Sequence, residues 1–97
     1  MENNNIEIIL KNKIRELACF LISICDSEDN RKNIEDSLID LPSYKIMFFL
    51  SFLSRNKIDN QIDDFIKIYS LTDTIDNREK INKYIEYFIE VKQIIYM

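Results

Sequence analysis

No glycine occurs in this chain of 97 residues, and proline occurs once. Glycine is the residue that most readily takes the positive φ angles of two-residue hairpin turns, so its absence disfavours a fold built on tight β-hairpins. The same absence excludes the glycine-rich loops that hold phosphates in nucleotide-binding folds. We therefore expect a chain that folds mainly into helices.

The length and composition fit one small globular domain. Apolar residues make up 46% of the chain and charged residues 31%, close to the averages of globular proteins. The richness in isoleucine, asparagine and lysine is typical of AT-rich codons. We expect a single helical domain over residues 1–97, with residues 1–5 as a frayed N-terminus.

Apolar residues recur at helical spacing through most of the chain. Leu10, Ile14, Leu17 and Leu21 follow steps of four and three residues, which places them on one face of a helix. We predict an all-α fold, a compact bundle of about five helices, over residues 5–25, 28–39, 44–55, 59–69 and 76–96. The predicted core contains Leu10, Ile14, Leu17, Leu21, Ile46, Phe49, Leu50, Leu53, Ile62, Phe65, Ile66, Ile81, Ile85 and Phe88.

The helix over 44–55 has hardly a polar side, and we expect it to be the buried central element. Ser43 is placed to cap its start, and Asn56 to end it in the left-handed conformation that glycine usually takes. Asp76 followed by Glu79 resembles a capping box that opens the last helix.

Histidine is absent, which removes Ser-His and Cys-His nucleophile pairs and imidazole metal ligands. Cys19 and Cys25 lie about 240° apart around one helix and cannot pair there, so we expect two buried free thiols, with an intermolecular disulfide as the alternative. Acidic pairs such as Asp36 and Asp40 would need further ligands from a second element to hold a cation. We expect no enzyme activity, no metal and no cofactor.

The longest apolar runs have about nine residues, where about 20 are needed to span a membrane. We expect no membrane segment and a cytoplasmic location, in the host cytoplasm if the chain comes from a virus or phage.

Charge is unevenly distributed around a net charge of −4. Residues 26–40 and 59–76 are strongly acidic, whereas residues 41–58 carry Lys45, Arg55 and Lys57 and no acid. The acidic segments would attract a basic protein partner, or they only keep the surface soluble. The residues expected to face the partner are Glu35, Asp36, Asp40, Asp59, Asp63 and Asp64.

The last helix is apolar over more of its circumference than one packing stripe needs, because its polar residues occupy an arc of only about 100°. Its surplus apolar residues, Tyr87, Val91 and Ile94, predict self-association as a homodimer, preferably antiparallel. Alternatively, two neighbouring helices of the same chain cover both flanks of this helix.

These features predict a small acidic, non-catalytic module that covers a partner protein's surface, as inhibitors, antitoxins, immunity proteins and anti-defence proteins do. The alternative is an architectural subunit of a homo-oligomer or larger assembly. A nucleic-acid-binding regulator ranks third: it rests only on Lys45 to Lys57, and basic residues are not interleaved with the tyrosines that could stack on bases.

Overall fold

The computed structural model describes the backbone of residues 2–95 and the side chains of residues 6–95. Within this part of the chain the structure contains five α-helices and no strand, which confirms the predicted all-α bundle. None of these helices is both long enough and apolar enough to cross a membrane. The elements are α1 (Glu2–Ser23), α2 (Glu28–Ile34), the π-helical segment η1 (Glu35–Ile39), α3 (Ser43–Phe52), the 3-10 turn η2 (Arg55–Lys57), α4 (Ile58–Tyr69) and α5 (Ile75–Ile95).

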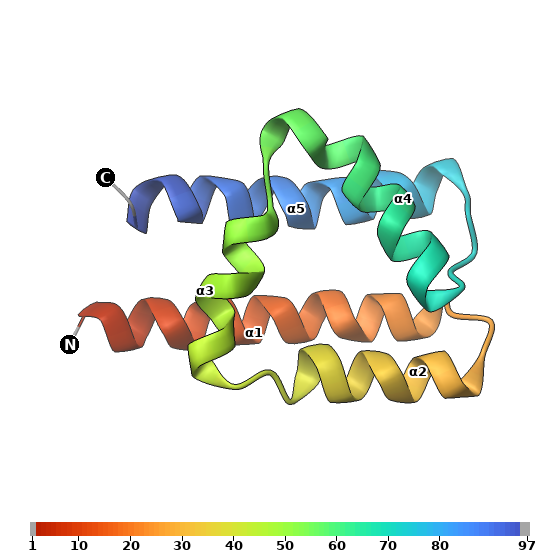
Figure 1. Ribbon diagram of the computed structural model, residues 1–97, viewed down its shortest axis with the longest axis horizontal. Helices are drawn as coiled ribbons and strands as arrows, with labels where there is room; N and C mark the ends of the chain where they lie inside the picture. The colour runs from red at the N-terminus through yellow and green to blue at the C-terminus, as the bar shows by residue number, and fades with distance from the viewer. Residues whose placement is uncertain (1, 96–97) are drawn as a thin grey trace.

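Figure 1 shows α1 and α5 side by side and antiparallel, with α2 along the other side of α1. The helices α3 and α4 cross this row: α3 passes from the end of η1 across α1 toward α5, and α4 returns to the beginning of α2. The molecule measures 40 × 27 × 18 Å, and its thinnest dimension accommodates two layers of helices packed about 8–10 Å apart.

Helix α1 forms the centre of the core. Its residues Leu10, Ile14, Leu17, Ala18 and Leu21 are at most 1% exposed, and α2, η1, α3 and α5 all contact this helix. The spacing of the buried residues is the predicted one. The other buried residues are Cys25, Ile34, Leu38, Ile46, Leu50, Leu53, Ile62, Leu71, Ile81, Ile85, Phe88 and Ile89.

Two predictions about burial are wrong. Helix α3 is not the buried central element: only Ile46 and Leu50 within it are buried, because α3 crosses the α1–α5 pair on the outside and is covered on one side. Cys19 is exposed whereas Cys25 is buried, so only one of the two free thiols is enclosed. Three predicted core residues are half-buried rather than buried: Phe49, Phe65 and Ile66.

The ends of the helices also differ from the predictions. Thr74, rather than Asp76, caps the start of α5, since its hydroxyl accepts a hydrogen bond from the Asn77 N–H at 3.1 Å. Ser43 lies inside the first turn of α3 and makes no capping hydrogen bond with its side chain. The left-handed residue is Ser70, at φ 53°, after α4.

Asn56 belongs to the 3-10 turn η2 and does not take the predicted left-handed conformation. At the other end of the chain, α1 begins at Glu2, within the segment predicted to fray. The side chains of residues 1–5 lie outside the described part of the chain.

At one end of the molecule, two loops are joined by backbone hydrogen bonds. Cys25 and Leu71 form an isolated antiparallel bridge, in which the Asp26 N–H donates to the Ser70 carbonyl at 3.1 Å and the Thr72 N–H donates to the Ile24 carbonyl at 2.8 Å. The Cys25 thiol donates to the Tyr69 carbonyl at 3.0 Å. The loop from α1 to α2 is thereby joined to the loop from α4 to α5.

Candidate functional site: an aromatic face on helix α3

Three large aromatic side chains project from one side of α3. Tyr44, Phe48 and Phe52 are four residues apart, which places them within about 80° of one another around the helix axis. Their exposed fractions are 70%, 64% and 76%. The opposite side carries Ile46 and Leu50, which are buried where α3 packs on α1 and α5. We call Tyr44, Phe48 and Phe52 the aromatic face.

Contacts with α5 fix the position of α3. The rings of Phe49 and Phe88 meet edge to face, with centroids 5.4 Å apart. The Lys92 ammonium donates hydrogen bonds to the carbonyls of Ser51 at 3.4 Å and Leu53 at 3.1 Å, at the end of α3, where carbonyl groups lack partners within the helix. The aromatic face is therefore held in a defined orientation.

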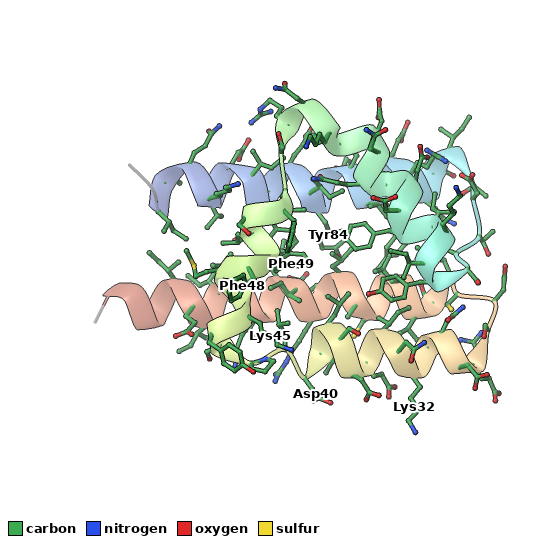
Figure 2. The ribbon with its side chains drawn as sticks, in the orientation of Figure 1. Lys32, Asp40, Lys45, Phe48, Phe49 and Tyr84 are labelled. Carbon is green, nitrogen blue, oxygen red and sulfur yellow. The ribbon has the colours of Figure 1, made fainter. Side chains whose placement is uncertain are left out.

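A groove of about 220 Å³ lies between α3 and α4, beside the aromatic face. Phe52, Phe65 and Ile68 line it, and Asp64 adds a carboxylate at its edge. The Gln61 side chain donates to the Phe52 carbonyl at 2.6 Å, but its own oxygen is buried without a hydrogen-bond partner among the described residues. Figure 2 labels Phe48 of the aromatic face and Phe49, the next residue of α3.

A second hollow, of about 550 Å³, lies on the other side of α3. Its apolar lining includes Leu10 of α1, Met47 of α3 and Ile94 of α5. Met47 and Ile94 are 38% and 65% exposed. The aromatic face therefore belongs to a wider apolar surface that continues on both flanks of α3.

The six acidic residues predicted to face a partner are all exposed, but they do not form one cluster. Figure 1 shows α2 and η1 along one edge of the molecule and the beginning of α4 at the opposite edge. Glu35, Asp36 and Asp40 lie on the first edge, at which Figure 2 labels Asp40. Asp59 lies in the first turn of α4, and Asp64 lies at the α3–α4 groove.

Asp63 is turned toward α5, where its carboxylate lies 2.8 Å from the Arg78 guanidinium. The same guanidinium pairs with Asp73 at 2.6 Å and lowers the pKa of that carboxyl group. In the described part of the chain, no three Asp, Glu, Cys or His residues are grouped so that they could hold a metal ion.

The three residues predicted to drive self-association have different surroundings. Tyr87 and Val91 are half-buried and pack against the core of their own chain, and the Tyr87 ring meets the Phe88 ring at a centroid distance of 5.7 Å. Ile94 is exposed beside the second hollow. Part of the surplus apolar surface of α5 is thus covered within its own chain, and self-association through these residues stays a prediction.

Burial raises the pKa of the Tyr69 hydroxyl, and a hydrogen bond with Ser37 offsets part of the shift. Tyr69 ends α4 and lines the α3–α4 groove together with Leu38 of η1. The Tyr69 side chain is therefore half-buried beside η1, at one end of the groove.

The aromatic face was missed in the sequence because an apolar run indicates burial without saying how many neighbours a helix has. One signal was available: Tyr44, Phe48 and Phe52 share a face opposite Ile46 and Leu50. Helix α3 has only ten residues and lies between two short loops. When it buries the face with Ile46 and Leu50, the aromatic face stays in solvent.

No family model, curated protein or solved structure matches this chain. The aromatic face and the charges around it are therefore the features from which its function can be inferred.

Proposed function

We propose that this chain is a small, non-catalytic protein-binding module that covers a surface of a partner protein, as inhibitors, antitoxins, immunity proteins and anti-defence proteins do. The observation that carries the proposal is the aromatic face of α3, where three aromatic side chains are each about two-thirds exposed. Aromatic residues are enriched at the centres of protein interfaces, where their burial supplies much of the binding free energy.

The size of the apolar surface supports this function. An aromatic side chain buries about 150–250 Å², so three that are two-thirds exposed offer roughly 300–500 Å². A specific interface needs about 800 Å² from each partner. Met47 and Ile68, on the two flanks of α3, extend the apolar area toward that value.

The charges near the aromatic face favour a partner with an apolar side chain flanked by basic residues. Asp40 precedes α3 in the chain, and Asp64 lies at the groove beside Phe52. Opposite charges would fix the register of a partner and speed its encounter, as the acidic segments led us to expect. Lys45 is exposed on α3 itself, so substitutions of single charges test which sign dominates.

The test is photo-crosslinking from the aromatic face in a lysate of the organism that encodes the chain. A photoreactive phenylalanine analogue replaces Phe48 or Phe52, and the control carries it at Ile75, which is equally exposed at the start of α5. We expect one protein to be crosslinked from positions 48 and 52 and not from position 75. That protein is then purified, and its binding to the chain is measured directly.

The substitutions Phe48→Ser and Phe52→Ser, made together, should abolish binding to the purified partner, whereas the matched pair Ile9→Ser and Ile75→Ser should retain it. Asp64→Asn should weaken binding and reduce its dependence on salt, and Lys45→Gln should not weaken it. Binding that survives the double phenylalanine substitution in a folded protein would refute a role for the aromatic face.

The alternative function is that of an architectural subunit, and the exposure of Ile94 beside the second hollow favours it. In that case the partner is a second copy of the chain. Light scattering should then report a dimer that Tyr87→Asp and Ile94→Asp dissociate. We place either function in the cytoplasm, where the exposed Cys19 thiol would stay reduced.

A further inference from the structure

A third hollow, of about 510 Å³, lies between α1 and α5 and has a different character. Three lysines and three aromatic residues line it. They are Lys13 and Phe20 of α1 with Lys80, Lys83, Tyr84 and Tyr87 of α5. Its volume falls within the range of about 300–1,000 Å³ that is typical of small-molecule sites.

The spacing of these residues along the two helices brings them together. On α5 they are separated by steps of three, one and three residues, so they form one stripe along the helix. On α1, Lys13 and Phe20 are seven residues apart, which is two turns on the same side. Because α1 and α5 are antiparallel neighbours, the two stripes meet, and Figure 2 shows Tyr84 directed from α5 toward α1.

The aromatic rings position the lysine side chains. The Lys13 ammonium lies 4.9 Å from the centroid of the Tyr87 ring and 5.7 Å from that of the Tyr84 ring. The Lys80 ammonium lies 5.3 Å from the centroid of the Phe20 ring. Cation–π attraction at these distances holds the ammonium groups near the rings rather than free in solvent.

The positive charge in this hollow is largely uncompensated. Lys13 shares its charge with Glu16, whose carboxylate lies at 3.6 Å. Among the described side chains, neither Lys80 nor Lys83 has a carboxylate within 4.0 Å. The chain has a net charge of −4, but this local excess of positive charge would attract an anion to the hollow.

We propose that this hollow binds a phosphate-bearing ligand with a planar aromatic ring, and specifically a free mononucleotide. On binding, the ammonium groups of Lys13 and Lys80 would move off the ring faces and, with that of Lys83, contact the phosphate. The rings of Phe20, Tyr84 and Tyr87 would contact the base, since aromatic rings stack on bases without regard to sequence. The site lies on α1 and α5 and needs nothing from the aromatic face of α3.

A single-stranded nucleic acid offers the same chemistry but fits the molecule less well. Binding along a strand draws on a continuous basic groove, whereas the lysines here occupy one hollow and the chain is acidic as a whole. A mononucleotide needs only the one phosphate site and one stacking surface.

The test is a titration of the full chain with adenosine monophosphate, followed by amide chemical shifts in nuclear magnetic resonance spectra. Saturable shifts are expected for residues 13–20 and 80–87. Adenosine alone and inorganic phosphate alone should each bind about tenfold or more weakly, because each keeps only part of the contacts. The variant with Lys80→Gln and Lys83→Gln should weaken binding of adenosine monophosphate by a similar factor.

The control variant carries Lys57→Gln and Lys67→Gln, which removes two exposed lysines from η2 and α4, and should bind as the unmodified chain does. Circular dichroism verifies that both variants fold. The proposal is overturned if no saturable shift is seen, if Lys80→Gln and Lys83→Gln have no effect, or if phosphate alone binds as well. Tight binding of a single-stranded oligonucleotide with none of the mononucleotide would also overturn it.

Discussion

Helix α3 is more apolar in sequence than α1, yet α1 forms the centre of the core and α3 is half in solvent. The second half of α1 includes Leu17, Ala18 and Leu21, none of which is measurably exposed. In α3, Phe48 and Phe52 are more than 60% exposed. Hydrophobicity alone therefore does not decide which helix lies at the centre of a small bundle.

The difference comes from the number of neighbours. Helix α1 has α5 on one side, α2 and η1 on the other and α3 across it, whereas α3 contacts α1 and α5 through a single side. The length of 22 residues gives α1 room for these four neighbours, and the ten residues of α3 span little more than the width of the α1–α5 pair. In α3, the apolar residues on the uncovered side add little to the core and are exposed to solvent.

The largest expected effect is a difference in the free energy of unfolding between a substitution in α1 and one in α3. Leu21→Ala in α1 should lower the free energy of unfolding by about 2–5 kcal/mol, because it leaves a cavity in a closely packed core. Phe48→Ala in α3 should change it by no more than about 0.5 kcal/mol, because its side chain is largely in solvent. Urea denaturation followed by circular dichroism measures both. Equal losses would mean that α3 is enclosed as α1 is.

A second effect concerns the attachment of α3 to α5. Lys92→Met should lower the free energy of unfolding by about 1–2 kcal/mol, since two carbonyl groups at the end of α3 lose a charged donor. Lys67→Met, at an exposed lysine of α4, is the matched control and should cost about 0.5 kcal/mol or less. If the two substitutions cost the same in urea denaturation, Lys92 does not fix α3.

The beginnings of the helices provide a third, smaller contrast. Thr74→Ala removes the cap of α5 and should cost about 1 kcal/mol. Ser43→Ala at the start of α3 should cost only a few tenths of a kcal/mol, because this hydroxyl makes no capping bond. Thermal unfolding of the two variants distinguishes them, and a larger loss for Ser43→Ala would restore the capping role that its sequence position suggests.

The smallest expected effect is confined to alkaline pH. Tyr69 holds its proton more tightly in the folded chain than in the unfolded chain, since burial raises its pKa above the ordinary value of 10.0. Its contribution to stability is therefore complete below about pH 10 and is lost as the pH rises through the raised pKa.

Tyr69→Phe removes that titrating group, so the variant should lose less stability than the unmodified chain between neutral and strongly alkaline pH. Urea denaturation of both proteins, at neutral pH and at strongly alkaline pH, measures the two losses of stability. Parallel losses in the two proteins would show that burial does not protect the Tyr69 hydroxyl in the folded chain.

Much of the fold follows from local sequence. The 4-3 spacing of Leu10, Ile14, Leu17 and Leu21 fixes the inward side of α1 wherever its neighbours lie. The start of α5 was placed at Asp76 instead of Thr74 because both are good capping residues, and only the observed hydrogen bond distinguishes them. Periodicity thus identifies helices and their faces more reliably than their ends.

The candidate sites depend on tertiary placement, which local pattern does not contain. The sequence places Phe48 on the face opposite Ile46, but which of these two faces is covered follows from where α3 crosses the other helices. The hollow between α1 and α5 is lined by both Lys13 and Lys80. These residues come close only when α1 and α5, from opposite ends of the chain, pack side by side in antiparallel orientation. Basic and aromatic residues that are not interleaved along the sequence are interleaved in space.

The bridge between Cys25 and Leu71 also constrains how the chain reaches its fold. The two bridged residues are as far apart in the sequence as Asp26 and Thr72, which are separated by 46 positions and whose side chains are hydrogen-bonded. Closing a loop of that length costs about 3 kcal/mol in chain entropy. The intervening segment contains α2, α3 and α4, while α1 and α5 come from opposite ends of the chain. Contacts between residues far apart in the sequence slow folding. The side of α1 that faces α5 is therefore covered only when the C-terminal third of the chain has joined the fold. During synthesis this side is the last part of the core to be enclosed.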